Sequence, residues 1–366
     1  MLYSLLMSIS KLQIQRVRNI SSINIEPSPA INIICGENGS GKTSILESIN
    51  ILGLTRSFRT NKAHHVVQND QLASVVFGFI DPMMQGLKQS LGVERPAEGE
   101  ARIRFEGSDI GLSTLAELIP LQVINSDTFQ LLEGSPAIRR QFLDWGVFHA
   151  DKAFIQLWRG FRRVLKQRNT LLKCGKIDNQ LRQVWDSEFI AFSDQLTRLR
   201  KEYLSLLKPE FDSVISQLLE GTKIELGFSY GWDKKRQLDE VLASNFERDL
   251  RQGFTGNGPQ RADLRLKVDG HNAAERLSRG QKKLVVSALK LAQGVLFQRM
   301  NSRPCIYLID DLPSELDQIH GELFCKVLEQ SSNQCFITCV DDSALKTYWS
   351  PQTEIATFRI AEGSLC

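Results

Sequence analysis

Long apolar runs and closely spaced cysteines are both missing from this chain of 366 residues. No run of about 18 apolar residues occurs, which argues against a membrane span. The apolar start lacks the basic flank of a secretory signal, and both Met1 and Met7 stand as candidate first residues. The seven cysteines form no C-x-x-C pair and lie mostly in apolar runs. This pattern favours buried free thiols in a reducing cytoplasm over a metal site.

An excess of charge of one sign is also missing, since the net charge is only +3. The charge balance alone therefore indicates no class of partner. The hydrophobic content of 42% is typical of globular proteins. The length exceeds that of one ordinary core, so two domains, or one domain with a large insert, are expected.

One segment, Gly36 to Thr43, matches the phosphate-binding pattern G-x-x-x-x-G-K-[ST]. A β-branched run at 31–35 precedes it and a helical pattern at 44–52 follows, which is the context that the motif requires. Its glycines let backbone N–H groups turn toward a phosphate, and the helix dipole adds to the attraction. The pattern predicts that Lys42 contacts the β- and γ-phosphates of ATP and that Thr43 ligates Mg²⁺. The predicted nucleotide-binding residues are Gly36, Glu37, Asn38, Gly39, Ser40, Gly41, Lys42 and Thr43.

Two polar residues outside this loop are further nucleotide-binding candidates. Gln122 lies on a short predicted strand, where ATPases can carry a switch glutamine. Arg59 lies on a polar loop beside the expected nucleotide and could contact phosphate or base. A solvated loop arginine would show the same pattern.

Three later segments predict the other half of an ATP site. Leu277 to Gln281 resembles the signature loop of ATP-binding-cassette (ABC) proteins, where it binds the γ-phosphate held by a partner subunit, and Ser278 suits a helix N-cap. An apolar strand ends at Asp310, a Walker B pattern whose carboxylate would hold Mg²⁺ through water. Ser314 to Asp317 resembles the D-loop of a dimer interface. The expected catalytic residues are Lys42, Asp310, Asp311 and Ser278, the metal ligands are Thr43 and Asp310, and the interface residues are Ser278, Arg279, Gly280, Gln281, Ser314 and Asp317.

Two departures from the ABC pattern predict slow hydrolysis. Asp311 stands where a longer glutamate usually polarises the attacking water, so either the water sits closer or turnover is slow. The usual switch histidine is missing from residues 337–342, where Thr338 or Asp341 could replace it.

The periodicity elsewhere predicts an α/β fold around a helical middle. We expect an ABC-type P-loop ATPase head, formed by 7–134 and 223–366, with a helical lobe at 135–222 inserted into it. Strand patterns occur at 9–35, 73–80, 89–95, 101–107, 121–124, 223–230, 264–268, 305–311, 334–340 and 355–360, and a further helix is predicted over 273–300.

A heptad seam marks the helical lobe. It consists of Phe189, Phe192, Leu196, Leu199, Tyr203 and Leu206. We predict that Pro209 interrupts this helix and that the helix pairs with 151–175 as a short antiparallel coiled-coil hairpin. The seam spans about two and a half heptads, which is too few for a long rod.

The helix at 151–175 is strongly basic and contains no acid between its first residue, Asp151, and Asp178. A solvated helix face is one explanation, and a surface that follows a phosphate backbone is the other. The candidate DNA contacts are Arg159, Arg162, Arg163, Lys166 and Arg168.

Taken together, these segments resemble the RecF family of bacterial recombination mediators, in the branch of ATPases that includes structural-maintenance-of-chromosomes (SMC) and Rad50 proteins. The most specific is Gly134-Ser135-Pro136 with Arg139, Arg140 and Leu143-Asp144. The resemblance implies a cytoplasmic, weak, DNA-stimulated ATPase that forms an ATP-dependent homodimer. It also implies binding to double-stranded DNA near gaps and cooperation with RecR and RecO to load RecA in gap repair and replication restart.

Other classes of P-loop protein fit less well. The ATPase subunit of a membrane transporter would carry the same motifs but needs no basic helical insert and usually has the switch histidine. A chromosome-organising ATPase would need longer coiled coils. A nucleoside kinase or a GTPase would need neither Ser278 nor the segment from Ser314 to Asp317.

Overall fold

The computed structural model describes residues 8–81, 88–174 and 178–366. Contacts divide them into two units. The first unit comprises the described residues of 1–128 with 214–219 and 283–366. The second unit comprises those of 129–213 with 220–282.

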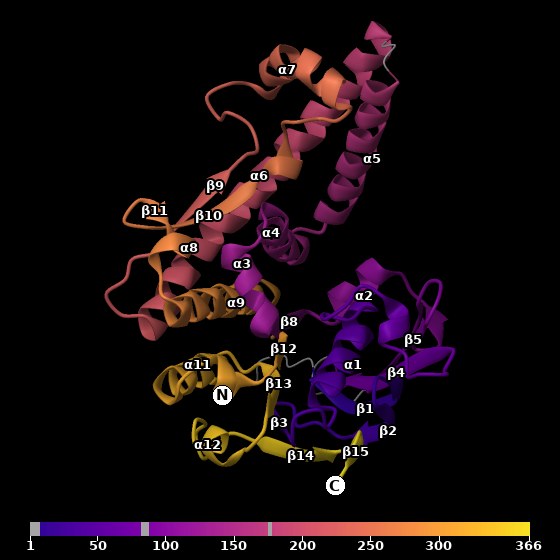
Figure 1. The fold of residues 1–366 in the computed structure, drawn as a ribbon, viewed down its shortest axis with the longest axis vertical. Helices are drawn as coiled ribbons and strands as arrows, with labels where there is room; N and C mark the ends of the chain where they lie inside the picture. The colour runs from indigo at the N-terminus through magenta and orange to yellow at the C-terminus, as the bar shows by residue number, and fades with distance from the viewer. Residues whose placement is uncertain (1–7, 82–87, 175–177) are drawn as a thin grey trace. The chain divides into compact units, whose positions relative to one another are not determined.

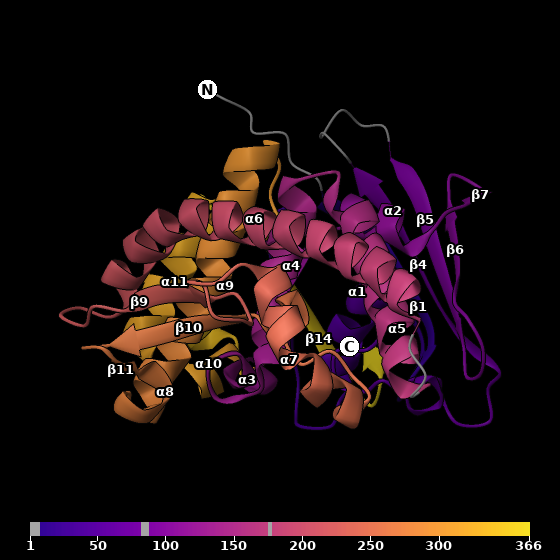
Figure 2. The same cartoon turned by 90° about the horizontal axis from the view of Figure 1, so that it is seen from above.

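This division differs from the expected boundary at residue 223. Residues 220–282 belong to the second unit instead of the ATPase head. The physical reason is local pairing: β9 (Glu225–Ser229) and β10 (Asp263–Val268) form an antiparallel ladder with each other, visible side by side in Figure 2. Asp263 of this ladder also pairs with Arg139 of the helical segment.

The first unit contains an antiparallel sheet with the strand order β2-β1-β4-β5-β6-β7. Alternation of buried and partly exposed residues along β4 shows that one face is covered more fully than the other, as in most antiparallel sheets. The predicted antiparallel strands 73–80 and 89–95 are confirmed, and the one predicted at 101–107 is shorter, because residues 106–107 form the turn before β7. The strands are β1 (Ser8–Val17), β2 (Ile20–Ile25), β4 (Ala73–Asp81), β5 (Gln89–Pro96), β6 (Arg102–Phe105) and β7 (Ser108–Asp109).

A second sheet of the same unit has the order β15-β14-β3-β13-β12-β8. All of its pairs are parallel except β14 with β15. Every residue of β3, β12 and β13 is buried, which explains why these strands are mostly apolar in the sequence. The strands are β3 (Ile31–Cys35), β8 (Leu121–Ile124), β12 (Ile306–Ile309), β13 (Gln334–Cys339), β14 (Ile355–Ala361) and β15 (Ser364–Leu365).

Helix α1 (Lys42–Leu54) joins the two sheets through one core. Its buried side chains Ile45, Ile49 and Leu52 belong to the same apolar cluster as Val76 of the antiparallel sheet and Leu308 of the parallel sheet. Figure 1 shows α1 beside the strands of the antiparallel sheet. The other helical elements of the first unit are η1 (Ala63–His65), α2 (Leu112–Leu118), η2 (Ser126–Phe129, whose last residue opens the second unit), α10 (Leu312–Glu315), α11 (Gln318–Gln330) and α12 (Ser343–Lys346).

The second unit is mainly helical. Two of its helices, α6 and α9, continue into residues of the first unit. A small sheet, ordered β11-β10-β9, accompanies the helices. The elements are α3 (Gln130–Glu133), α4 (Pro136–Ala150), α5 (Phe154–Lys173), α6 (Asn179–Leu218), β9, α7 (Leu238–Gln252), η3 (Pro259–Arg261), β10, β11 (His271–Asn272), α8 (Ala273–Arg276) and α9 (Arg279–Asn301).

Helices α5 and α6 lie side by side as the predicted antiparallel hairpin (Figure 1). The rings of Phe161 and Phe189 lie 5.6 Å apart, and Arg168 reaches Asp186 at 2.7 Å. Later residues of α5 thus meet earlier residues of α6, which fixes the antiparallel direction. Among the described residues, no helix combines the length and apolar character needed to cross a membrane.

Two details of the seam prediction were wrong. Helix α6 runs through Pro209 to Leu218. Proline removes one backbone hydrogen bond, but Pro209 is exposed, so water can reach the freed carbonyl, and the flanking Leu207 and Phe211 are fully buried. The predicted seam residue Leu206 is 40% exposed, because the buried side of α6 carries Leu207 at this point instead.

The segment most typical of the RecF resemblance forms partly buried ion pairs inside the second unit. Arg139 contacts Asp263 through two nitrogens, at 2.7 and 3.2 Å. Asp144 accepts two bonds from Arg200 of α6, at 2.7 and 2.9 Å, and Arg200 is 3% exposed. These ion pairs connect α4 to β10 and to α6, so the residues of this segment stabilise the packing of the second unit.

Arg168 must be removed from the candidate DNA contacts. Its side chain is 1% exposed and lies inside the second unit. It donates to Asp186 at 2.7 Å, to Asp249 at 3.3 Å and to the Thr255 hydroxyl at 2.8 Å. The sequence could not separate it from its neighbours, because helical position alone does not show which arginine meets a buried carboxylate.

We predict that Arg168→Ala lowers the free energy of unfolding by about 3–5 kcal/mol, because it leaves the fully buried Asp249 without its cation. The neighbouring exposed Lys166→Ala is the matched control and should stay within about 0.5 kcal/mol of wild type. Urea unfolding of the full chain measures both. Equal stability of the two variants would contradict this assignment.

Candidate nucleotide-binding site

The predicted phosphate loop connects the end of β3 to the start of α1. A β-carbon at Gly36 would lie 2.2 Å from the Ile360 carbonyl oxygen of β14, so no larger residue fits there. Gly41 caps α1 with φ of 116°, a conformation that other residues rarely adopt. The loop is therefore pressed against β14 at one end and turns sharply into the helix at the other.

Lys42 and Ser40 point polar atoms into this loop. Lys42 is 8% exposed, and its ammonium donates to the carbonyls of Gly36 (2.7 Å) and Glu37 (2.8 Å). Ser40 is 7% exposed, and its hydroxyl has no hydrogen-bond partner among the described residues. The first backbone N–H groups of α1 lack partners within the helix, as at every helix start. The loop thus concentrates hydrogen-bond donors, as an anion-binding site requires.

Asp310 connects the phosphate loop to two strands. It follows β12, and its carboxylate accepts from the Thr43 hydroxyl at 3.0 and 3.2 Å. The same carboxylate accepts from the Thr338 hydroxyl of β13 at 2.7 Å. The predicted metal ligands Thr43 and Asp310 therefore meet, although they are far apart in the sequence.

Asp311 adopts an unusual backbone conformation, with φ of 55° and ψ of 52°. Such conformations carry strain in residues other than glycine and occur often at functional sites. Its N–H donates to the Thr338 hydroxyl at 2.8 Å, and its carboxylate accepts from Ser314 at 2.5 Å. Of the two proposed replacements for the switch histidine, Thr338 bonds to both Asp310 and Asp311, whereas Asp341 is exposed and bonds to Ser343.

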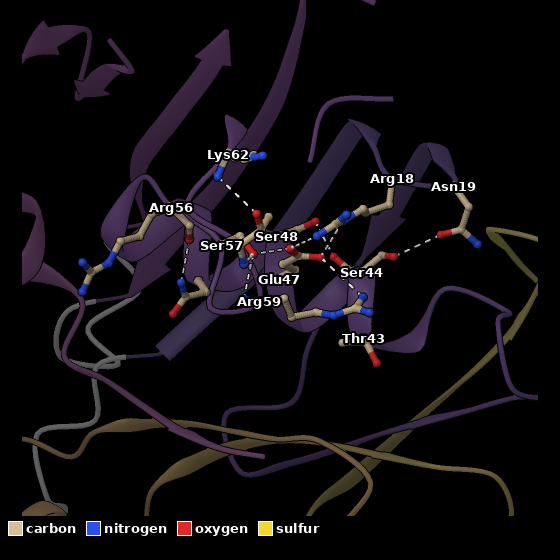
Figure 3. A network of polar contacts seen from close by, with 12 residues as sticks. Arg18, Asn19, Thr43, Ser44, Glu47, Ser48, Arg56, Ser57, Arg59 and Lys62 are labelled. Atoms are coloured by element: carbon tan, nitrogen blue, oxygen red, sulfur yellow. Dashed lines mark hydrogen bonds and ion pairs between the residues drawn. The ribbon is translucent and has the colours of Figure 1, made fainter. Parts of the chain in front are cut away.

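A buried carboxylate of α1, that of Glu47, lies at the centre of a network of polar contacts with Arg18 and with the loop at 57–60 (Figure 3). It is fully buried and accepts two bonds from Arg18, at 2.7 and 3.0 Å. The Ser57 hydroxyl also donates to it, and Ser57 in turn accepts from the N–H groups of Arg59 and Thr60, at 2.9 and 3.1 Å. Glu47 therefore holds the 57–60 loop in place.

The candidate Arg59 stands on this loop at half exposure, with its guanidinium 4.0 Å from Glu47. Its contact with nucleotide stays a prediction, and the sequence analysis did not identify its anchor, Glu47. A glutamate within a helical pattern gives no sign of burial, and the nearest signal in the sequence is the arginine that it pairs with, Arg18, in the turn before β2.

The turns after β1 and β14 also support the loop. Asn19 donates to the Gly39 carbonyl at 3.3 Å and accepts from the Ser44 hydroxyl at 3.0 Å. Gly363 donates its N–H to the Ser40 carbonyl at 2.8 Å. The sequence analysis did not identify these contacts, because both turns lie far from the motif along the chain.

The structure contradicts the prediction that Gln122 contacts nucleotide. Its side chain is 1% exposed in β8, where it donates to Gln293 at 3.0 Å and accepts from Lys290 at 3.2 Å. It pairs in register with Tyr307, three residues before Asp310 in the neighbouring strand. We expected the Gln122 side chain to face the nucleotide, but its amide forms hydrogen bonds with Gln293 and Lys290 of α9.

The signature segment lies at the start of α9, in residues of the second unit. Ser278 is exposed; its N–H donates to Gln281 Oε1 at 3.0 Å and its hydroxyl accepts from the Gln281 N–H at 3.3 Å. This reciprocal capping box is the predicted N-cap. Arg279 and Gly280 are also exposed.

The predicted D-loop, Ser314 to Asp317, lies in the first unit and runs from the last residues of α10 to the N-cap of α11. Asp317 caps this helix by accepting from the His320 N–H at 3.0 Å. This bond, together with a second from the His320 ring, lowers the pKa of Asp317 below its usual value. Ser314 and Asp317 are both exposed, as an interface segment requires.

Comparison with known proteins identifies the family. The sequence pattern described as "RecF/RecN/SMC N terminal domain" matches residues 8–359. The "DNA replication and repair protein RecF" of Pseudomonas syringae pv. syringae is 47% identical over 360 residues, covering 98% of both chains, and that of Pseudomonas aeruginosa (strain LESB58) is 46% identical. The chain belongs to the RecF family.

Solved structures agree on the fold of this RecF-family chain. A structure titled "Structure of the recombination mediator protein RecF-ATP in RecFOR pathway" matches with a TM-score of 0.85 at 22% identity, over 100% of this chain and 98% of that one. An Smc head bound to the C-winged helix domain of ScpA matches with a TM-score of 0.60 at 14% identity, over 98% of this chain and 95% of that one. At such identities the similarity is evidence for the fold alone. This fold confirms the predicted ABC-type ATPase head.

We predict that Glu47→Ala destabilises the chain by about 2–4 kcal/mol, because Arg18 loses a bidentate partner and Ser57 loses its acceptor. It should also speed tryptic cleavage after Arg59, since the 57–60 loop loses its anchor. Urea unfolding and limited trypsin digestion measure the two effects. Glu26→Ala, which removes an exposed carboxylate of the same unit, is the control. Unchanged cleavage at Arg59 in Glu47→Ala would show that the loop does not depend on this carboxylate.

Proposed function

We propose that this chain is an ATP-dependent DNA-binding ATPase of recombinational gap repair and replication restart. The observation that carries the proposal is the convergence of Lys42, Thr43, Asp310 and Asp311 at one edge of the parallel sheet. Asp310 is bonded directly to Thr43, and the two come from distant segments. A shared fold does not by itself define a function, but this set of side chains supports nucleotide chemistry.

The donor set fits ATP and Mg²⁺. Thr43 and Asp310 supply the hard oxygen ligands that Mg²⁺ prefers. Lys42 and the unpartnered Ser40 hydroxyl suit a polyphosphate at the loop. Bound Mg²⁺ would neutralise charge on the β- and γ-phosphates. Asp311, strained and held by Thr338 and Ser314, would orient the attacking water as a general base, and its short side chain favours slow turnover.

The exposed groups of the signature segment and of the D-loop support dimerisation around ATP. The Ser278 hydroxyl and the N-terminus of α9 are open to a γ-phosphate held by a second copy. Near the D-loop, Ile319 is 70% exposed, and Val340, after β13, is 55% exposed, which suits surfaces that a partner covers. ATP would hold the dimer together, and hydrolysis would release it.

The basic face of α5 is the proposed contact with double-stranded DNA. Arg159, Arg162, Arg163 and Lys166 are exposed along this helix. Such residues bind phosphates without reading sequence. By its family, we propose that the chain works with RecR and RecO to load RecA near gaps.

We predict that Lys42→Arg weakens ATP-dependent dimerisation by about ten- to hundredfold, because arginine cannot take the position of the compact ammonium within the loop. Ser278→Arg should block dimerisation but leave ATP binding by the single chain intact. Light scattering with ATP and Mg²⁺ measures the mass, and fluorescent ATP measures nucleotide affinity. Ser108→Arg, at an exposed serine of β7, is the control. A Ser278→Arg chain that pairs normally at saturating ATP would refute the shared site.

We predict that reversing the charge at Arg162, Arg163 and Lys166 weakens duplex binding uniformly across sequences. The slope of log affinity against log salt should fall by about three, one for each lost phosphate contact. Fluorescence anisotropy with ATP over a salt series measures both quantities. The same reversal at the exposed residues Lys223, Lys267 and Lys326 is the control. Equal losses in both triple variants would show that only net charge matters.

A further inference from the structure

The turn that joins β14 to β15 lies against the phosphate loop. It consists of Glu362 and Gly363, with φ of 48° and 76°, between the paired residues Ala361 and Ser364. A two-residue turn with both φ values positive suits the twist of antiparallel strands, and glycine adopts it most readily. The N–H of Gly363 donates to the Ser40 carbonyl at 2.8 Å. A turn far along the chain thus bonds directly to the predicted phosphate-binding segment.

Little space separates this turn from the phosphate loop and from the turn after β1. A β-carbon at Gly363 would lie 2.2 Å from the Asn19 carbonyl oxygen. A β-carbon at Gly41 would lie 3.2 Å from the Asn19 amide nitrogen and 3.5 Å from the Gly363 α-carbon. Gly363 is buried, although Glu362 beside it is exposed. Any side chain at position 363 would therefore push the turn, Asn19 or the loop aside.

The two turns hold two consecutive peptide units of the phosphate loop. Asn19 donates to the Gly39 carbonyl at 3.3 Å. Gly363 holds the next carbonyl, that of Ser40. In a planar trans peptide, the C=O of one residue and the N–H of the next point in opposite directions. Since both carbonyls face the turns, the N–H groups of the same two units are directed away from them.

These N–H groups belong to the part of the loop that a phosphate would approach. The Ser40 N–H is directed across the loop, where it donates to the Glu37 carbonyl at 3.2 Å. The Gly41 N–H belongs to the N-cap of α1, where backbone N–H groups and the helix dipole attract anions. An anion site made of backbone N–H groups requires that the loop carrying them be held in one conformation. The carbonyl bonds to the two turns provide this restraint.

We propose that Gly363 and Asn19 are positioning residues for nucleotide binding, and that the β14–β15 turn responds to occupancy of the phosphate loop. This role rests on the ATP binding proposed above. A nucleotide that orders the Ser40 and Gly41 peptide units also strengthens the bond from Ser40 to Gly363. By reciprocity, a displaced turn weakens the nucleotide by the same factor. The β14–β15 turn is thus coupled to the ATP site through one hydrogen bond and one close contact.

The chain contains a natural control for this turn. Glu106 and Gly107 join β6 to β7 with φ of 49° and 77°. These values are almost those of the β14–β15 turn, and serine follows the glycine in both turns. A β-carbon at Gly107 would meet no atom of the described residues within 4 Å. Alanine therefore brings about the same backbone strain to both turns, but only at Gly363 does it press on Asn19.

The test compares Gly363→Ala with Gly107→Ala in the full chain. Titration with fluorescent ATP and Mg²⁺ should show about tenfold weaker binding in Gly363→Ala and wild-type affinity in Gly107→Ala. Asn19→Ala, which removes the bond to the loop without adding a clash, should weaken ATP by about fivefold. Thermal melting without nucleotide shows whether each variant is folded. Wild-type affinity in both Gly363→Ala and Asn19→Ala would overturn the proposal.

Hydrogen exchange of the wild-type chain tests the coupling without any substitution. At a protein concentration where light scattering shows single chains, ATP and Mg²⁺ should slow exchange at residues 360–366 by about threefold. Exchange at 104–110, around the control turn, should not change. A purely structural bond would be equally protected with and without nucleotide. A chain that binds ATP with no change at 360–366 would refute the coupling but not the ATP site, whereas a wild-type chain that binds no ATP would refute both.

Discussion

The carboxylate of Asp310 is the constraint on which the candidate site depends. It accepts hydrogen bonds from Thr43, at the start of α1, and from Thr338, at the end of β13. These contacts hold the phosphate loop at the edge of the parallel sheet, where strands β3, β13 and β12 end together. The same oxygens are suited to bind a divalent cation, so the bonds that define the site's shape also define its chemistry.

Buried charge also organises both units away from this edge. Glu47 holds Arg18 and the 57–60 loop in the first unit, and the pairs of Arg200 with Asp144 and of Arg168 with Asp249 hold the second. Such pairs add little net stability compared with apolar packing, but losing one partner leaves an unpaired buried charge. They therefore favour one arrangement of helices over its alternatives, and the ion pairs of Arg139 and Asp144 have the same effect in the second unit.

The sequence predicted the elements whose pattern is local. The phosphate loop, the buried parallel strands and the α5–α6 hairpin follow from glycine spacing, mostly apolar runs and helical periodicity. Errors arose where a side chain's direction depended on distant partners. Gln122 was expected at the nucleotide and is bonded to α9, Arg168 was expected at the surface and is buried, and Pro209 lies inside a continuous helix.

The amino-acid sequence by itself thus determined the chemistry available to this protein: a phosphate loop, a Walker B aspartate, a capped signature helix and a basic α5. Tertiary structure alone decided which of these groups meet. Thr43 and Asp310 are 267 positions apart, and Glu47 pairs with Arg18, which lies 29 positions before it. The physical reason is that residue type and spacing set hydrogen-bonding capacity and local conformation, whereas burial and partnership are properties of the packed chain.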